Sequence, residues 1–393
     1  MFERLSTSET DPILALMQAF QADPRPNKVD LGIGVWRDAE GRTPVFQAVK
    51  TAEERIWHSQ DSKIYVGFRG DPGFHAAVSD LLLGPEGDGD WRAASATTGG
   101  TSAVQTALAL ARTARPDLRV WVPEESWPNH WVLARSLGLE TRNFTYIDPA
   151  TQEIERAGLL RDLAGARAGD VVLLHACCHN PTGADPDPEL QEEIVTSLAQ
   201  SGAIPVVDCA YLGFGAAPEA DLAFLRRLSA LPESIVAFSG SKSFGLYRER
   251  VGLCLALTES ARARDAVESQ LTRLNRETYS FPPDHGARVV TEILTDPTLR
   301  ASWDTELSAI RRALIDNRAN LAASLRARLN SDAFDRLTRQ NGMFAMLPLG
   351  TERVARLRAE HGLYIVGTGR INLAGVTEAT CAPVADALAA VLR

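Results

Sequence analysis

The sequence predicts an α/β protein with a largely parallel β-sheet and a second, smaller domain. In the middle of the chain, short apolar runs alternate with segments of helical periodicity, which is typical of βαβ units. The chain has 393 residues. This is more than one hydrophobic core usually organises, so two domains are expected.

Five apolar runs are expected to form strands of the sheet. They are LRVWVP (118–123), DVVLLHA (170–176), AIPVVD (203–208), SIVAFS (234–239) and VGLCLAL (251–257). Between the second and third runs, the apolar spacing of PELQEEIVTSLAQSG (188–202) predicts a helix that ends at Gly202, because glycine readily adopts the backbone conformation that terminates helices.

The pattern changes near residue 300. One long charged helix is predicted over residues 303–329, followed by strands within 340–347 and 369–375. We therefore expect a large domain over residues 44–305 and a small C-terminal domain over residues 306–393. Residues 1–43 are expected to form an N-terminal arm that packs with the small domain and is part of it.

Composition and charge exclude several classes of protein. The net charge is −9 at neutral pH and no basic cluster stands out, which argues against a nucleic-acid partner. The N-terminal segment lacks the apolar core of a signal peptide, and no apolar run reaches the ~18 residues that a membrane span needs. Five scattered cysteines are typical of reduced thiols, so we expect a cytoplasmic protein without a membrane partner.

Several polar side chains follow the predicted strands. Ligands of open α/β sheets bind at the carboxyl ends of the strands, so these side chains are expected near one site. They are Asn180, Asp208, Tyr211, Ser239, Ser241 and Lys242. Taken singly, each has a commoner structural explanation, such as a helix cap for Asp208 or a surface charge for Arg250. Upstream, Gly99 and Gly100 open a helix whose free N–H groups are a possible anion site.

Together, these groups match the chemical needs of pyridoxal phosphate. The cofactor's aldehyde requires an amine, for which Lys242 is available. Its phosphate is bound by a helix N-terminus, hydroxyls and a fixed guanidinium such as that of Arg250. Its ring nitrogen requires a carboxylate, such as Asp208, and its ring face an aromatic side chain, such as Trp127.

Motifs along nearly the whole chain give a more specific indication. They are DPILALM, KVDLGIGVWRD, SWPNHWV, HACCHNPTGAD, VVDCAYLGFG, SKSFGLYRERVG, YSFPPDHGA, QNGMFAML and GRINLAG. By these motifs the chain resembles the fold-type I, pyridoxal-phosphate-dependent aminotransferases, and among them the bacterial aspartate and aromatic aminotransferases of subclass Iα. The resemblance implies a large domain with a mostly parallel seven-stranded sheet sandwiched by helices, and a smaller α/β domain.

The resemblance also implies a role for each cofactor-binding residue. Lys242 is implied as the lysine that forms a Schiff base with pyridoxal phosphate and later moves a proton, and Asp208 as the partner of the ring nitrogen. Asn180 and Tyr211 are implied to hydrogen-bond the phenolic oxygen, and Trp127 to lie against the ring. The implied phosphate ligands are Gly99, Gly100, Thr101, Ser239, Ser241 and Arg250, with Tyr65 of the neighbouring subunit.

Two arginines carry the implied recognition of amino acids and 2-oxo acids. Arg370 matches the residue that clamps the α-carboxylate in two hydrogen bonds, which a lysine does poorly. Arg276 matches the arginine that is offered across a homodimer to a side-chain carboxylate. The other implied substrate-binding residues are Gly34 and Trp36, in a loop that closes over the substrate in the family, and Trp127 and Asn180.

Four positions depart from the commonest family pattern: Trp36, Leu212, Gly240 and Ser243. They leave the catalytic groups in place but put the side-chain specificity in question. The segment LNRETYSFPPDHGA is most similar to the aromatic aminotransferases, which accept acidic and aromatic amino acids. We therefore favour ping-pong transfer of the amino group from aromatic amino acids and aspartate to 2-oxoglutarate, with a strict aspartate aminotransferase as the alternative.

Three functions from other classes are less consistent with the sequence. A non-enzymatic pyridoxal-phosphate-binding regulator normally carries a fused DNA-binding segment, whereas the resemblance here begins within the first dozen residues. A nicotinamide dehydrogenase requires a third glycine after Gly32 and Gly34. A metal site is not expected at Cys177, Cys178 and His179, because adjacent side chains of an extended segment point apart. We expect His130, His175 and His179 to be hydrogen-bonded supporting residues.

Overall fold

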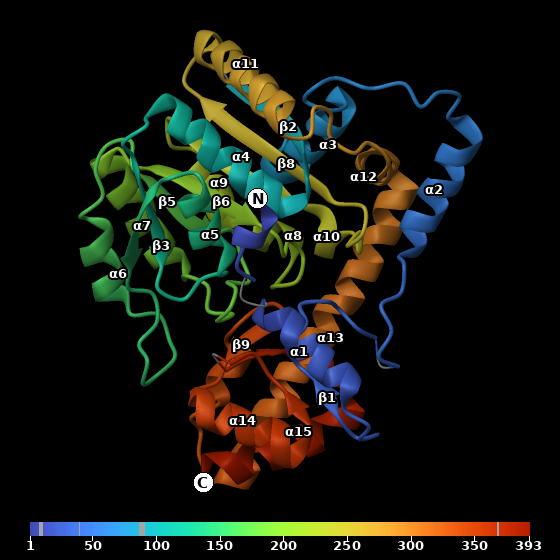
Figure 1. Ribbon diagram of the computed structural model, residues 1–393, viewed down its shortest axis with the longest axis vertical. Helices are drawn as coiled ribbons and strands as arrows, with labels where there is room; N and C mark the ends of the chain where they lie inside the picture. Colours follow the sequence, from blue (N-terminus) through green and yellow to red (C-terminus); the bar gives the residue numbers. More distant parts are fainter. Residues whose placement is uncertain (8–10, 39, 86–90, 368) are drawn as a thin grey trace.

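The computed structural model describes residues 1–7, 11–38, 40–85, 91–367 and 369–393. At its centre lies a seven-stranded sheet in the order β2-β8-β7-β6-β5-β3-β4 (Figure 1). The strands are β2 (Trp91–Thr98), β3 (Arg119–Pro123), β4 (Glu140–Phe144), β5 (Val171–His175), β6 (Ile204–Cys209), β7 (Ser234–Ser239) and β8 (Val251–Thr258). All neighbouring pairs are parallel except those of β8, which runs antiparallel to β2 and to β7. The five predicted strands are confirmed, as is the mostly parallel sheet.

Helices cover both faces of this sheet. One face packs against α4 (Gly99–Ala114), α5 (Asn129–Ser136) and α11 (Ala261–Thr278). The other packs against α3 (Pro72–Leu83), α6 (Arg156–Leu163), α7 (Pro188–Ser201), α9 (Ala223–Ser229) and α12 (His285–Thr295). Alternate residues of one strand serve the two faces: Val171 and Leu173 belong to one core, and Val172 and Leu174 to the other. Strands buried on both faces appear as continuous apolar runs, which is why they were predicted correctly.

A smaller group of elements lies below the sheet in Figure 1. It contains two pairs of short strands: β1 (Val29–Asp30) runs parallel to β10 (Leu363–Tyr364), and β9 (Phe344–Met346) antiparallel to β11 (Arg370–Asn372). The helices of this part are α1 (Pro12–Ala22), α14 (Gly350–His361) and α15 (Glu378–Leu392), and α15 packs on α13 (Pro297–Leu329). The boundaries at residues 43 and 305 remain a proposal, and α13 runs across the second of them.

The long charged helix begins earlier than predicted. It starts at Pro297 instead of residue 303, because Asp296 caps it by accepting hydrogen bonds from the N–H groups of Thr298 and Leu299. The helix at 188–202 ends as predicted, with Gly202 in the left-handed conformation at φ 70°.

In the described part of the chain, the remaining elements are one further helix, two short helices and three 3₁₀ turns. They are α2 (Gln47–Ser59), α8 (Pro218–Asp221), α10 (Gly240–Ser243) and the 3₁₀ turns Phe2–Arg4, Asp335–Thr338 and Leu373–Gly375. Within the described ranges, no helix is long and apolar enough to cross a membrane.

Candidate functional site

A cavity of about 180 Å³ lies at the carboxyl edge of the central sheet. Strands β5, β6 and β7 are parallel and end at this edge, so the segments that follow them converge there. The cavity is lined by Gly34, Gly100, Thr101, Trp127, Asn180, Asp208, Ala210, Tyr211, Ser239, Ser241, Lys242, Tyr247 and Arg250. All of these except Ala210 and Tyr247 were predicted site residues.

Lys242 lies in α10, the single helical turn that follows β7. Its side chain is half-buried, and its Nζ lies 5.1 Å from the centre of the Tyr211 ring. Burial lowers the pKa of Lys242, although the charge of Asp208 opposes this shift. Among the described residues none forms a hydrogen bond or an ion pair with Nζ within the usual distances. A desolvated amine without a fixed partner is suited to attack an aldehyde.

Asp208 lies at one end of a chain of hydrogen-bonded polar side chains beside the cavity. Its Oδ2 lies 3.2 Å from Nε2 of His130, and Nδ1 of the same ring lies 2.8 Å from Oγ of Ser126. Burial alone would raise the pKa of Asp208, but the hydrogen bond from His130 and the nearby charges outweigh it, so the pKa is lowered. Asp208 therefore remains a carboxylate that can accept a hydrogen bond from a protonated ring nitrogen.

The N-terminus of α4 and Arg250 form a cradle for an anion. Gly99 has φ +80°, and a Cβ built at this position would lie 2.5 Å from Nη2 of Arg250. A Cβ at Gly100 would lie 2.7 Å from Cβ of Ser239. Only glycine leaves room for these contacts. Nη1 of Arg250 is 3.4 Å from Oγ of Ser241, so a helix N-terminus, hydroxyls and a guanidinium meet in one place, as a phosphate requires.

Asn180 and Arg370 connect the two parts of the molecule beside the cavity. Nη1 of Arg370 donates to Oδ1 of Asn180 at 3.4 Å, and Nδ2 of Asn180 donates to the hydroxyl of Tyr211 at 3.4 Å. Arg370 is buried, its guanidinium lies 4.3 Å from the centre of the Phe344 ring, and no carboxylate among the described residues pairs with it. Its Nε also has no partner within that part of the chain. A buried, unneutralised guanidinium is suited to a substrate carboxylate.

Tyr65 and Arg276 do not line the cavity of their own chain. The Tyr65 ring, which is 75% exposed, stacks on Phe281 at 4.4 Å, and Phe281 stacks on Phe68 at 4.5 Å. The guanidinium of Arg276 lies 5.6 Å from the centre of the Phe68 ring. Both predicted residues thus lie on one exposed aromatic stack.

The four departures from the family pattern lie beside the cavity. Oγ of Ser243 donates to the carbonyl of Leu212 at 2.9 Å, so two of them contact each other. Gly240 packs against Val251, and a Cβ built at this position would lie only 3.3 Å from Cβ of Val251, which is a tight contact. Trp36 is half-buried, and its backbone N–H donates to the Tyr247 hydroxyl at 3.1 Å.

The prediction for the histidines is only partly correct. His130 and His179 have hydrogen-bond partners, since Nδ1 of His179 lies 2.9 Å from Oγ1 of Thr182. Neither nitrogen of His175 has one among the described residues. Burial lowers the pKa of His175 to about 3, so its ring is neutral. The centre of its ring lies 5.3 Å from that of His130 and 4.4 Å from that of His179. These ring contacts cannot be recognised from the spacing of apolar residues in the sequence.

Cys177 and Cys178 do not lie on an extended segment, contrary to the prediction. Cys178 has φ +53° and is not extended, and the two sulfurs lie close to a carboxylate oxygen of Asp221. That carboxylate already accepts hydrogen bonds from the N–H groups of Gly213, Gly215 and Ala216. A hydrogen bond with Cys178 and burial raise the pKa of Cys177, and burial raises that of Cys178 to about 12, so both are protonated thiols, which are poor metal ligands.

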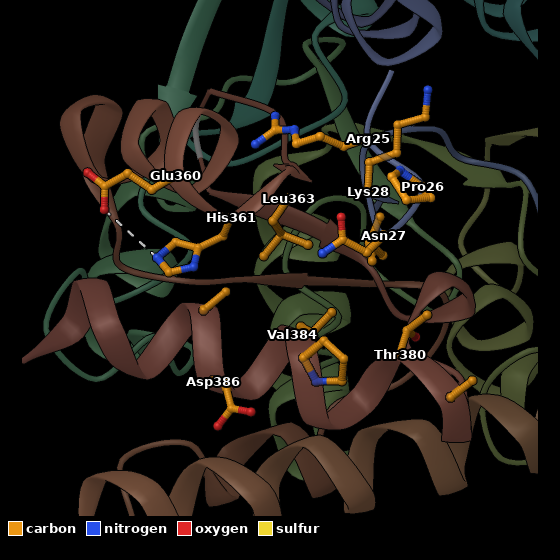
Figure 2. Close-up of a pocket in the computed structure, with 14 residues that line it drawn as sticks. Arg25, Pro26, Asn27, Lys28, Glu360, His361, Leu363, Thr380, Val384 and Asp386 are labelled. Carbon is orange, nitrogen blue, oxygen red and sulfur yellow. Dashed lines mark ion pairs between the residues drawn. The ribbon is translucent and has the colours of Figure 1, made fainter. Parts of the chain in front are cut away.

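A second cavity, of about 510 Å³, lies between the N-terminal arm and α15 (Figure 2). Its charged side chains have partners in the protein. Lys28 donates to the carbonyls of Phe20 and Asp23, and Asp386 pairs with Arg328. This cavity therefore lacks the free amine and the anion cradle of the first, and the first is the better candidate for the functional site.

Comparison with known proteins agrees with this geometry. The family pattern described as "Aminotransferase class I and II" matches residues 26–388. The chain is 44% identical over 389 residues to the aromatic-amino-acid aminotransferase of Paracoccus denitrificans, covering 99% of both chains. It is 41% identical over 396 aligned positions to the aspartate aminotransferase of Escherichia coli K12, covering 100% of both.

A solved structure gives the same result. The aromatic-amino-acid aminotransferase from Burkholderia pseudomallei, covalently bound to pyridoxal phosphate, superposes with a TM-score of 0.97 at 37% identity, and the match covers 100% of both chains. The chain belongs to the aminotransferase class I and II family.

Proposed function

We propose that the protein is a pyridoxal-phosphate-dependent aminotransferase that moves the amino group of aromatic amino acids and aspartate to 2-oxoglutarate. The observation that carries this proposal is the cavity in which Lys242, Asp208 and the cradle around Arg250 face one another. When bound, pyridoxal phosphate supplies a ring that withdraws electrons from the Cα of the amino acid.

The residues of the chain would then divide the work. The amine of Lys242 would hold the cofactor and, when free, would move the proton at Cα of the substrate. The carboxylate of Asp208, supported by His130, keeps the ring nitrogen protonated. Asn180 and Tyr211 orient the ring through its phenolic oxygen. 2-Oxoglutarate enters after the first product has left, which makes the reaction ping-pong.

Arg370 and Arg276 are proposed to select the substrate. Arg370 is buried and already close to Asn180, so it is placed to bind the α-carboxylate that all amino acids share. Arg276 is exposed, and within the described part of the chain its side chain contacts Phe68 and Ser280 without an ion pair, so it is free to bind a side-chain carboxylate or to turn away from it. An arginine kept beside a phenyl ring without a partner is costly, so acceptance of aromatic substrates requires this freedom. Relatives include both aromatic and aspartate aminotransferases.

We also propose that the chain acts as a cytoplasmic homodimer. Tyr65 and Arg276 lie away from the cavity of their own chain, on the exposed stack described above, where they can reach the site of a second subunit. The five cysteines are all free and buried, as expected in a reducing compartment.

A single-turnover reaction tests the proposed function. Protein loaded with pyridoxal phosphate is mixed separately with aspartate, tyrosine and phenylalanine, without a 2-oxo acid, and the cofactor absorbance is followed. Comparable second-order rates for all three are the expected result. A fast reaction with aspartate alone would instead identify a strict aspartate aminotransferase, and no reaction with any of them would contradict the proposal. The Lys242→Ala variant is the matched control and should show no change.

A further inference from the structure

The loop of residues 31–37, which follows β1, is attached firmly to the small part of the molecule. It reaches the cavity at Gly34. Nδ2 of Asn372 donates to the carbonyls of Ile33 and Val35 at 2.6 and 3.0 Å. These bonds fix the loop to β11 and the turn after it.

Asp30 and Arg370 add to this attachment. Oδ1 of Asp30 accepts the N–H of Gly32 at 2.9 Å, and its Oδ2 pairs with Arg37 at 2.9 Å. Nη2 of Arg370 donates to the carbonyl of Gly32 at 2.8 Å. The loop is therefore tied directly to Arg370, the residue proposed to bind the α-carboxylate.

Tyr247, which belongs to the proposed large domain, contacts the same loop. Its hydroxyl accepts the backbone N–H of Trp36 at 3.1 Å. Among the residues that the structure describes, this is the one hydrogen bond that a side chain of the proposed large domain, residues 44–305, makes with the loop, and the side chain is its acceptor. Tyr247 also lines the cavity, and its carbonyl accepts a hydrogen bond from Nη1 of Arg250 at 3.2 Å. Tyr247 thus forms one hydrogen bond with the loop of residues 31–37, called the substrate loop below, and one with Arg250 of the anion cradle.

We propose that the Tyr247 hydroxyl is the large-domain anchor of the substrate loop and positions Gly34 and Trp36 over a bound amino acid. This role rests on the proposed aminotransferase function. Tyr247 is a positioning residue, since it acts through the loop. Burial raises the pKa of Tyr247 to about 12, so the hydroxyl is neutral at ordinary pH and the anchor does not titrate there.

Loss of the Tyr247 hydroxyl should weaken the binding of the amino acid and leave the binding of pyridoxal phosphate unchanged. The loop contributes Gly34 to the cavity, whereas the anion cradle and Asp208 belong to other segments. Tyr247→Phe keeps the ring that forms the cavity wall and removes only the hydroxyl. The matched control is Tyr364→Phe. The Tyr364 hydroxyl also forms a hydrogen bond with the N-terminal arm, donating to Oδ2 of Asp23 at 2.8 Å, but both residues belong to the small part of the molecule.

Two measurements test the proposal. Hydrogen exchange of the peptide that contains residues 31–37, in protein without an amino acid, reports the anchor without any need for activity. Single-turnover kinetics with aspartate give the apparent dissociation constant and the limiting rate. In Tyr247→Phe we expect the Trp36 amide to exchange about two- to twelvefold faster, and the apparent dissociation constant to rise by a similar factor, which corresponds to one neutral hydrogen bond.

The pyridoxal phosphate affinity of Tyr247→Phe should stay within about twofold of the wild type. In Tyr364→Phe, neither the exchange rate of the Trp36 amide nor the apparent dissociation constant for aspartate should change. Unchanged exchange in Tyr247→Phe would overturn the anchor. Faster exchange with an unchanged amino-acid constant, or an equal loss of cofactor affinity, would overturn the positioning role. If the wild-type protein reacts with no amino acid, the proposed function fails, while the exchange data still decide whether the anchor exists.

Discussion

Nε2 of His130 lies 3.2 Å from Oδ2 of Asp208, and the other nitrogen of this ring contacts Ser126. The imidazole lowers the pKa of the carboxylate against the effect of burial. His130→Phe keeps a ring at this position and removes the hydrogen bond. A hydrogen bond to a charged group contributes about 1.5–3 kcal/mol, so we expect the dissociation constant for pyridoxal phosphate to rise roughly tenfold or more.

A titration followed by cofactor absorbance measures this constant. His58→Phe, at an exposed histidine in α2, is the control and should bind the cofactor normally. A wild-type affinity for pyridoxal phosphate and a wild-type single-turnover rate in His130→Phe would mean that the role of Asp208 does not depend on the imidazole.

Ser243 links the segment of the proposed catalytic lysine to the segment of Tyr211. Its Oγ donates to the carbonyl of Leu212, and its carbonyl accepts Nε1–H of Trp303 at 2.7 Å. Ser243→Ala should slow the limiting single-turnover rate about two- to tenfold, because one neutral hydrogen bond is lost and Lys242 becomes less well positioned. Ser201→Ala, which removes a comparable bond to the carbonyl of Leu198 in α7, should leave the rate unchanged. Equal rates in the two variants would contradict the positioning of Lys242 by Ser243.

Arg276 is proposed to bind the side-chain carboxylate of aspartate in a second subunit. Arg276→Ala should lower kcat/KM for aspartate roughly 10- to 150-fold, the value of one hydrogen bond to a charged group, and change that for phenylalanine by less than about threefold. Arg273→Ala is the matched control, since Arg273 lies one turn earlier in α11 and pairs with Glu277. Equal losses for both substrates would show that Arg276 does not recognise the side chain.

Asp170 forms a buried ion pair that should make stability depend on pH. Its Oδ2 accepts Nε–H of Arg119 at 2.9 Å. Burial acts to raise the pKa of Asp170, but hydrogen bonds from Arg119, Arg167 and Trp121 outweigh it and hold the pKa at about 2, below its ordinary 3.8. The folded-state pKa is depressed, so the stabilisation is present above pH 3.8 and is lost as the pH falls towards 2.

Asp170→Asn should therefore lower the free energy of unfolding by about 3 kcal/mol at neutral pH, because the charge of Arg119 is left unpaired. Urea unfolding at several pH values measures the difference from the wild type. We expect this difference to be constant between pH 7 and 5 and to shrink below pH 4. A difference that grew in acid would contradict the assignment.

Sequence patterns predicted the buried part of the sheet well and its edges poorly. Strands β5, β6 and β7 are apolar throughout and were predicted within a residue or two. The edge strand β4 has the sequence ETRNF, and the edge strand β2 has the sequence WRAASATT with three alanines, so neither shows the apolar pattern of a buried strand. The early start of α13 was also missed, although Asp296 and Pro297 form a recognisable helix start.

For the site, motifs indicated which residues meet but not what supports them. Lys242, Asp208 and Arg250 were predicted from the needs of one cofactor, and they line one cavity. Tyr247 lies inside the motif SKSFGLYRERVG but was not singled out, because its contact with Trp36 joins segments more than 200 positions apart. Hydrogen bonds between such distant segments, including that of His130 with Asp208, depend on the packed structure and leave no local pattern in the sequence.

Reduction of the loaded protein with borohydride, followed by peptide mass mapping, tests the central claim most directly. Reduction fixes pyridoxal phosphate on the amine that holds it. The chain has four lysines: Lys28, Lys50, Lys63 and Lys242. We expect the added mass on the peptide that contains Lys242 and on no other. Label on Lys28, Lys50 or Lys63 with Lys242 unmodified would contradict the proposed site and, with it, the mechanism.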